Sequence, residues 1–238
     1  MQRKAYHNSC GNHTHSEVNF LDSKHFQIQT NKANTMDKYA QTDHPIHDLL
    51  KTRWSPRTFS AQPVESEKLF SLFEAARWSA SGGNTQPWSF IVTSRENPAA
   101  FEKLLGTLGE RNQLWAKNAP VLVLSITKSE REPGKPNAWA GYDLGQSVAH
   151  LSVQASALGL YVHQMGGFDR QKAAQVFELP AGHEAMTVFT IGYPGDPASL
   201  PEGLRERELE TRTRKPLSEF VFDGAWQQPL AEKNASLN

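Results

Sequence analysis

Two arginine clusters at opposite ends of the chain have the residue types of a phosphate site. One is the segment Arg53-Trp54-Ser55-Pro56-Arg57, and the other is Arg212-Thr213-Arg214-Lys215-Pro216-Leu217. Guanidinium groups hold phosphate through paired hydrogen bonds, and a serine hydroxyl adds a further donor. Arginines at these spacings also often lie in solvent on a helix face, so neither cluster is diagnostic by itself.

A third segment has the composition of a loop that approaches a flat ligand. It reads Ser81-Gly82-Gly83-Asn84-Thr85-Gln86-Pro87-Trp88. Its small residues allow close approach of the backbone, and its amide side chains supply donors and acceptors for the edge of a heterocycle. The preceding segment is amphipathic and the following one alternates, so the loop is expected between a helix and a strand.

The elements that position these segments follow from hydrophobic periodicity. We expect helices at 45–50, 66–78, 99–108, 113–118, 137–158 and 169–177, and strands at 88–93, 120–126, 160–163 and 185–191. No element is predicted in the highly charged stretch that follows Glu202. Helices and strands alternate without strict βαβ units, so the predicted fold class is α+β, with one domain over residues 36–238.

The longest predicted helix carries two different stripes. The apolar stripe, expected to face the core, is formed by Leu144, Val148, Leu151 and Ala155. A second stripe has a small residue at every fourth position, namely Gly141, Gly145 and Ala149. A glycine inside a helix costs about 1 kcal/mol relative to alanine, so this stripe indicates the close approach of another helix. That helix belongs either to the same chain or to a second subunit.

Several histidines and tryptophans allow more than one interpretation. His150 and His163 are candidate acid–base groups, but their apolar neighbours favour hydrogen-bonded packing residues. Four tryptophans are expected in the core or lining a pocket: Trp78, Trp88, Trp115 and Trp139.

The composition limits the possible classes of function. The 25 basic and 25 acidic side chains give a net charge of zero, so there is no overall field for binding nucleic acid or an anionic membrane. Cys10 is the only cysteine, which excludes an intramolecular disulfide and a cysteine-based metal site and fits the cytoplasm. No apolar run approaches the roughly 18 residues that a transmembrane helix needs.

Residues 1–35 differ from the remainder of the chain. They are rich in polar residues without a sustained period, and we expect a disordered extension, with Met36 as an alternative start of translation. No apolar core follows the basic residues at the start, so a signal peptide is not expected. Three histidines near Cys10 are potential metal ligands, although solvated side chains are the favoured interpretation: His7, His13 and His15.

Taken together, the motifs resemble those of the FMN-dependent nitroreductase family from about residue 45 to residue 221. The polar loop matches the family signature PS-x-x-N-x-QPW, with Ala80 in place of the proline. The other matches follow in the family's order: Arg53-x-Ser55-x-Arg57, Asn112 seven residues before Ala119-Pro120, Gly166-Gly167-Phe168-Asp169, and Arg212-x-Arg214 with Pro216-Leu217. Any one match is weak, but five in the right order are difficult to obtain by chance.

The resemblance implies a set of cofactor-binding residues. The residues implied for the FMN phosphate are Arg53, Ser55, Arg212 and Arg214. Arg57 would lie near the N1/O2 edge of the flavin and Asn112 at the O4/N3 side, while the backbone N–H of Gly166, in the turn with Gly167, would point toward N5. The residues implied to reach across from the second subunit of a homodimer are Ser81, Gly82 and Asn84.

The resemblance also implies a fold and a reaction. The fold would be a central, mostly antiparallel sheet flanked by helices. NADH or NADPH would reduce FMN and leave before an electron-poor small molecule is reduced, in a ping-pong cycle, and the flavin would carry the chemistry without a catalytic side chain or a metal. The implied acceptors are nitroaromatics, quinones and activated enones. The alternative function is a flavin-binding or flavin-sequestering protein without turnover.

Overall fold

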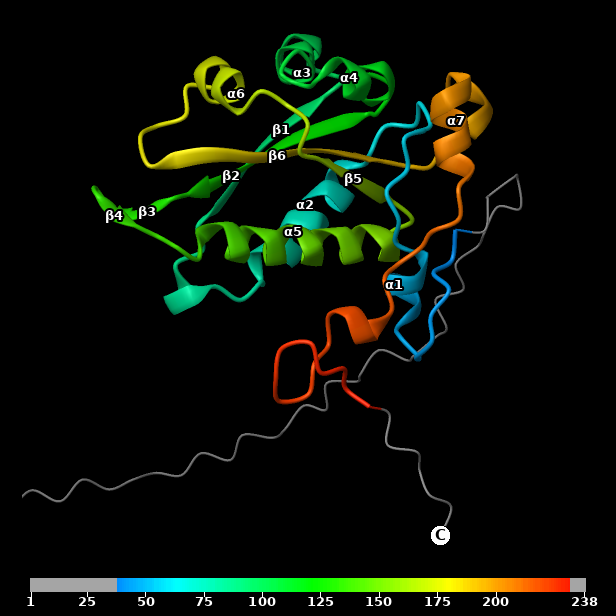
Figure 1. The fold of residues 1–238 in the computed structure, drawn as a ribbon. Coiled ribbons are helices and arrows are strands. Elements are labelled where there is room, and N and C mark those ends of the chain that lie inside the picture. The colour runs from blue at the N-terminus through cyan, green and yellow to red at the C-terminus, as the bar shows by residue number, and fades with distance from the viewer. Residues whose placement is uncertain (1–37, 232–238) are drawn as a thin grey trace, which may run out of the picture. The chain divides into compact units, whose positions relative to one another are not determined.

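A four-stranded sheet in the order β1-β2-β6-β5 forms the centre of the fold, and each neighbouring pair is antiparallel (Figure 1). The computed structural model describes residues 38–231. The strands of the sheet are β1 (Trp88–Ser94), β2 (Val121–Lys128), β5 (Tyr161–Met165) and β6 (His183–Gly192). The predicted α+β class and the antiparallel sheet are therefore confirmed. The predictions for residues 1–35, for Met36 and for the histidines near Cys10 lie outside the described residues.

Seven α-helices are present among residues 38–231. They are α1 (Asp48–Thr52), α2 (Ser66–Arg77), α3 (Pro98–Leu105), α4 (Glu110–Ala116), α5 (Ala140–Ala157), α6 (Arg170–Val176) and α7 (Glu202–Leu209). Helices α2 and α5 cover one face of the sheet, and α3, α4 and α6 cover the other (Figure 1). No helix in this part of the chain is long and apolar enough to span a bilayer.

The two hydrophobic cores follow from the two-residue period of a strand. Leu122 and Leu124 of β2 point into the core under α3, α4 and α6, whereas Val121 and Val123 point into the core under α2 and α5. Because both faces are covered, β2 is buried continuously from Val121 to Thr127. This explains why β2 begins with four consecutive apolar residues, Val121 to Leu124, rather than with an alternating pattern.

Helix α5 confirms the predicted apolar stripe and shows where the small-residue stripe lies. The apolar side chains are at most 3% exposed. Gly141, Gly145 and Ala149 lie on the exposed side of the helix. A Cβ atom built at Gly145 meets no described atom within 4 Å. The interpretation that a helix of the same chain packs against this stripe is therefore wrong for Gly145.

Two tryptophans differ from the expectation. Trp115 is 1% exposed and belongs to the core, but Trp78 is 77% exposed and Trp139 is 61% exposed. Trp78 directly follows the last residue of α2 and Trp139 directly precedes the first residue of α5, so both rings lie at helix ends rather than on the faces that pack against the sheet. As far as contacts within one chain are concerned, the prediction that these two tryptophans are core or pocket-lining residues is wrong.

The sequence prediction missed two elements. Helix α7 is polar throughout except for its two leucines, so it has no apolar stripe to reveal it. The hairpin of β3 (Glu130–Glu132) and β4 (Lys135–Pro136) has very short, mostly exposed strands. The remaining predicted elements are confirmed, with shifts of a few residues at their ends. For example, α4 begins at Glu110 rather than Gln113, which places Asn112 on the helix.

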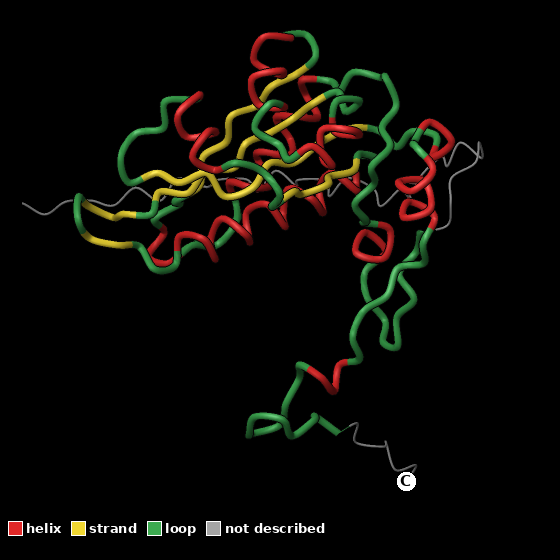
Figure 2. Tube along the Cα trace, turned by 45° about the horizontal axis from the view of Figure 1, so that its top comes forward, coloured by secondary structure: helices red, strands yellow, loops and turns green. Residues whose placement is uncertain are grey.

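The C-terminal segment 216–231 runs away from the sheet and its covering helices (Figure 2). It contains one turn of 3-10 helix at Leu217–Glu219 and an isolated bridge between Phe222 and Pro229. Four large apolar side chains of this segment are 46–81% exposed: Leu217, Phe220, Trp226 and Leu230. Little of this segment is therefore buried by its own chain.

Candidate functional site

The two arginine clusters, far apart in the sequence, meet at one cavity. We call this cavity of about 210 Å³ the arginine pocket, and its lining is Lys38, Trp54, Ser55, Arg57, Arg207, Glu208, Glu210, Thr211, Arg212 and Arg214. Arg53 is next to this lining, and burial and then the charges of Arg212 and Arg214 lower the pKa of its guanidinium. Its Nη1 atom lies 3.4 Å from the Ser55 hydroxyl. The five residues predicted from the two clusters are thus brought together.

The first cluster lies on an extended segment that leaves helix α1. The helix ends at Thr52, and Arg53 already has φ −63° and ψ 121°. Pro56 is buried and cannot donate a backbone hydrogen bond, and its carbonyl accepts one from Nδ1 of His163 at 2.8 Å. Strand β5 therefore holds this segment from one side.

His163 is a neutral packing residue, as predicted. Its imidazole lies against the Trp115 ring, with 4.5 Å between the ring centroids. Burial lowers the pKa of His163 to about 4, and the nearby charges of Arg57 and Arg53 act in the same direction. Since a carbonyl can only accept, Nδ1 carries the proton. The same expectation is wrong for His150, which is exposed on α5.

Arg212 has a structural role in addition to its place in the pocket. Its Nη1 atom donates to the carbonyl of Lys38 at 2.7 Å and to the carbonyl of Lys51 at 2.8 Å. It thereby ties the start of the described chain and the end of α1 to the stretch that follows α7. The carbonyl of Lys51 belongs to the last turn of α1, where no partner within the helix exists.

Lys38 and Glu208 are pocket residues that the sequence analysis missed. Lys38 is 8% exposed, burial lowers the pKa of its ammonium group, and this group donates to the carbonyl of Glu210. Glu208, on α7, is 1% exposed. A single lysine near the chain start and one glutamate in a charged stretch carry no motif, so no sequence signal was available for either residue.

A second group of predicted residues lies at the end of β5. The side-chain amide of Asn112 and the backbone N–H of Gly109 both donate to the Gly167 carbonyl at 3.0 Å. A Cβ atom at Gly167 would lie 3.1 Å from Nδ2 of Asn112, so a larger residue would disturb this contact. Strand β5 carries His163 against the arginine segment and ends one residue before Gly166. It therefore connects this group with the arginine pocket.

The predicted residues Ser81, Gly82 and Asn84 are not near the arginine pocket. The Gly82 N–H donates to Asp143 in the first turn of α5 at 3.0 Å, whereas α1 lies beside the other end of that helix (Figure 1). An α-helix of the 18 residues of α5 is about 27 Å long. Within one chain, the polar loop and the arginine pocket thus lie at opposite ends of α5.

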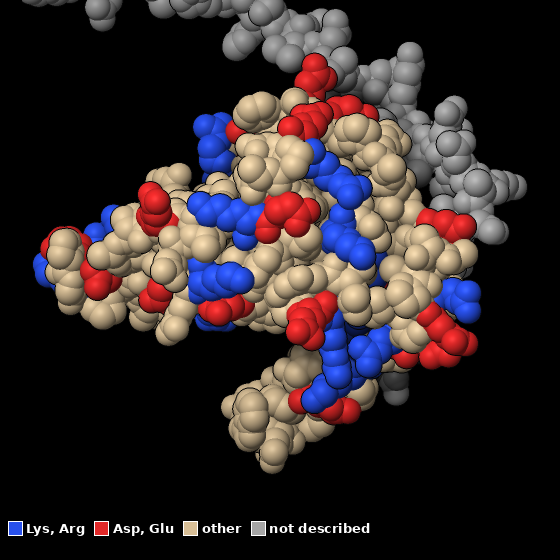
Figure 3. Space-filling model, turned by 90° about the horizontal axis from the view of Figure 1, so that it is seen from above, with Lys and Arg blue, Asp and Glu red and all other residues tan. Residues whose placement is uncertain are grey.

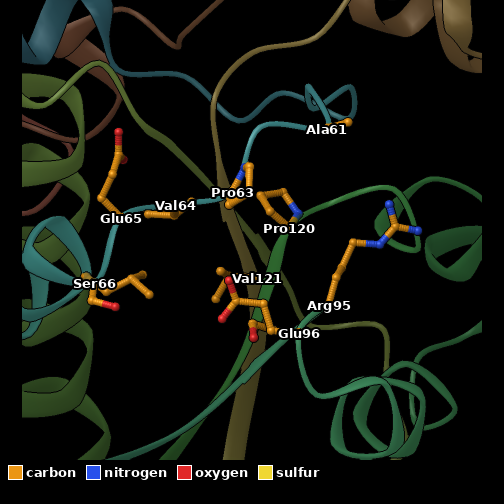
Figure 4. Close-up of a pocket in the computed structure, with 11 residues that line it drawn as sticks. Ala61, Pro63, Val64, Glu65, Ser66, Arg95, Glu96, Pro120 and Val121 are labelled. Carbon is orange, nitrogen blue, oxygen red and sulfur yellow. The ribbon is translucent and has the colours of Figure 1, made fainter.

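Another cavity contains none of the predicted residues. It measures about 450 Å³ and lies between the start of α2, the end of β1 and the start of β2 (Figure 4). Glu65 and Arg95 reach its rim, while Pro120 and Val121 form part of its wall.

The view of the molecule from above the face with α3, α4 and α6 shows basic and acidic side chains interspersed (Figure 3). Within residues 38–231, no group of three His, Cys, Asp or Glu side chains is arranged to hold a metal ion.

Comparison with known proteins assigns the family. The family model described as the nitroreductase family matches residues 50–193, which is more than half of the chain. The chain belongs to the nitroreductase family. The matched segment includes the first arginine cluster, Asn112 and the Gly166-Gly167 turn, and it ends before Arg212.

Several individual proteins are also similar to this chain. A crystal structure described as an oxidoreductase containing FMN is 33% identical with a TM-score of 0.76, and the match covers 82% of this chain and all of that one. An uncharacterized 15.4 kDa protein of Mycolicibacterium smegmatis is 34% identical over 55% of this chain and 86% of its own. The major NAD(P)H-flavin oxidoreductase of Aliivibrio fischeri is 28% identical over 69% of this chain and 96% of its own. Iodotyrosine deiodinase 1 of Sus scrofa is also similar, at 26% identity over 74% of this chain and 67% of its own.

Proposed function

We propose that the protein is an FMN-dependent oxidoreductase that uses NADH or NADPH to reduce an electron-poor small molecule. The observation that carries this proposal is the convergence of both arginine clusters on one pocket in a chain of the nitroreductase family. The structural relative described as containing FMN, which matches across 82% of this chain, supports the choice of cofactor.

The donors of the arginine pocket fit a dianionic phosphate. Arg53, Arg212 and Arg214 are close enough for their charges to lower the pKa of Arg53, so they repel one another when no anion lies between them. A phosphate would relieve this repulsion, and each charge-assisted hydrogen bond would contribute about 1.5–3 kcal/mol. Ser55 adds a hydroxyl donor. In this proposal, these four residues hold the phosphate.

The remaining predicted residues would bind and orient the ring. Arg57 would hold its positive charge near the edge of the flavin that becomes negative on reduction. Neutral His163 would keep its segment in place without adding a second charge. Asn112 and the turn at Gly166 would contact the other side of the ring. Bound FMN would supply the acceptance of hydride from NADH or NADPH and its delivery to the acceptor.

We further propose that the site is completed by a second copy of the chain. The polar loop with Ser81, Gly82 and Asn84 lies too far along α5 to reach the arginine pocket of its own chain. The exposed small residues of α5 and the exposed ring of Trp139 occupy the same region as this loop. A homodimer formed through α5 would cover this apolar surface and bring the loop to the partner's flavin.

The decisive experiment is spectroscopic. The purified protein should show the absorbance of a bound flavin, and NADH or NADPH should bleach this absorbance under nitrogen. Re-oxidation by nitroaromatics, quinones or enones would then identify the acceptor class. A bound flavin that neither cofactor reduces would instead indicate storage or sequestration of FMN. Because iodotyrosine deiodinases are among the relatives, iodotyrosine belongs in the same assay as a test of reductive dehalogenation.

A further inference from the structure

Glu208 is a buried carboxylate at the arginine pocket, and neither of the two arginine motifs contains it. It lies on α7 and is 1% exposed, although its neighbours Arg207 and Leu209 are exposed. Burial raises the pKa of its carboxyl group, while the surrounding N–H donors and the charges of Arg57 and Lys38 oppose this effect. A charge in such a place is costly unless it is well paired, so its partners indicate its role.

The partners of Glu208 belong to the segment that carries the first arginine cluster. The backbone N–H of Arg57 donates to both carboxylate oxygens, at 2.9 and 3.0 Å, and the N–H of Thr58 donates at 3.3 Å. The Arg57 guanidinium adds an ion pair, with 3.7 Å between Nη1 and Oε2. One carboxylate therefore binds two successive backbone N–H groups and one side-chain charge of the same loop.

The loop is fastened at two adjacent peptide groups. His163 holds the carbonyl of Pro56, and Glu208 holds the N–H groups of Arg57 and Thr58. These contacts come from two different elements, β5 and α7. The direction of Ser55 and Arg57 is thus determined by residues that do not belong to the motif.

From this geometry we propose that Glu208 is a positioning residue for cofactor binding. It fixes the backbone at Arg57 and Thr58 and balances one of the pocket's positive charges, so that Ser55 and Arg57 face the pocket in the conformation that binds phosphate. This proposal rests on the proposed FMN function. It requires the ionised carboxylate, because only that form accepts from all of these donors without presenting a proton of its own.

The test compares Glu208→Gln with Glu206→Gln. Glu206 lies on the same helix with an exposed side chain, so the second variant is the matched control. In Glu208→Gln the side-chain NH₂ group faces N–H donors and the charge opposite Arg57 is lost. We expect the dissociation constant for FMN, measured by quenching of flavin fluorescence, to rise about tenfold or more for Glu208→Gln and to stay unchanged for the control. Glu208→Asp, which keeps the charge, should recover part of the affinity.

A second measurement separates positioning from a general loss of stability. In ¹⁵N NMR spectra, the amide protons of Arg57 and Thr58 should exchange faster in Glu208→Gln, while the amides of β2 remain protected. If Glu208→Gln fails to fold, a pH titration of the wild-type chain tests the role of Glu208 instead. As the pH is lowered and the Glu208 carboxylate takes up a proton, the shifts of these two amide protons should change together with FMN affinity.

The outcomes distinguish the two proposals. A wild-type chain without affinity for FMN would overturn the proposed function and, with it, the role of Glu208. If the wild type binds FMN and Glu208→Gln binds it equally well, only the role of Glu208 is overturned. The same conclusion follows if affinity falls while both amides remain protected, or if their shifts and FMN affinity titrate separately.

Discussion

The buried His163 predicts a specific loss of stability in acid. Its pKa of about 4 lies roughly 2.5 units below the ordinary value of 6.5. Because the folded chain keeps the ring neutral, only the unfolded chain takes up a proton as the pH falls below 6.5. The stability that this group contributes is complete above pH 6.5 and is lost progressively down to about pH 4.

The size of this loss of stability follows from the same lowered pKa. A difference of one in pKa corresponds to about 1.36 kcal/mol, so the lowered pKa of His163 corresponds to at most about 3 kcal/mol. The ring is partly accessible, which reduces the expected loss to about 2 kcal/mol between pH 6.5 and 4. For a domain with a total stability of about 5–15 kcal/mol, this is a large and measurable part.

The assay is urea unfolding of the wild-type chain and of His163→Asn at several pH values between 7 and 4.5. Asparagine places a non-titrating N–H donor near the position of Nδ1, so the bond to the Pro56 carbonyl is retained. The variant loses packing against Trp115 and should be less stable at every pH, but its stability should fall less steeply with pH. His150→Asn, at an exposed position, is the control and should keep the wild-type slope. Equal slopes for the wild type and His163→Asn would refute this reasoning.

Three further predictions concern the proposed cofactor site. Arg53→Ala should lower FMN affinity at least tenfold in equilibrium dialysis, because it removes a charge-assisted contact worth about 1.5–3 kcal/mol. Arg212→Ala should lower FMN affinity and also the midpoint of urea unfolding, since Arg212 also binds the carbonyl groups of Lys38 and Lys51. Gly145→Leu should shift the protein toward a monomer without FMN in size-exclusion chromatography, because overpacking costs about 1–3 kcal/mol per site. Full flavin retention by Arg53→Ala, an unchanged urea midpoint for Arg212→Ala, or a Gly145→Leu monomer with stoichiometric FMN would contradict the respective prediction.

The sequence predicted those parts of the fold in which local pattern and tertiary environment agree. Strand β2 is one such case, because its four consecutive apolar residues fit a strand that is covered on both faces. Helix α5 is another, since its apolar stripe faces the sheet. Helix α7 was missed for the opposite reason. Its one nearly fully buried side chain is Glu208, whose burial depends on N–H groups some 150 residues earlier in the chain.

The candidate site also has residues that the sequence predicted and residues that it did not. The arginine clusters, Asn112 and the glycine turn were found because they form motifs whose order resembles that of a family. That they bind a flavin stays a prediction. Lys38 and Glu208 belong to no motif, and only the folded chain shows that they reach the same pocket. The exposure of Trp78 and Trp139 was also not predictable. A tryptophan beside a helical pattern gives the same sequence signal whether its ring is buried within its own chain or left exposed by it.

The bond between Arg212 and the carbonyl of Lys38 has a consequence for the order of events during synthesis. These residues are 174 positions apart, and the bond closes the pocket across nearly the whole described chain. During synthesis the sheet strands can pair and Ala40 can bond to Lys51, but Lys38 lacks its contacts to Glu210 and Arg212 until those residues have been added. A ligand that needs both arginine clusters can therefore meet a complete pocket only after Arg212 and Arg214 have been added to the growing chain.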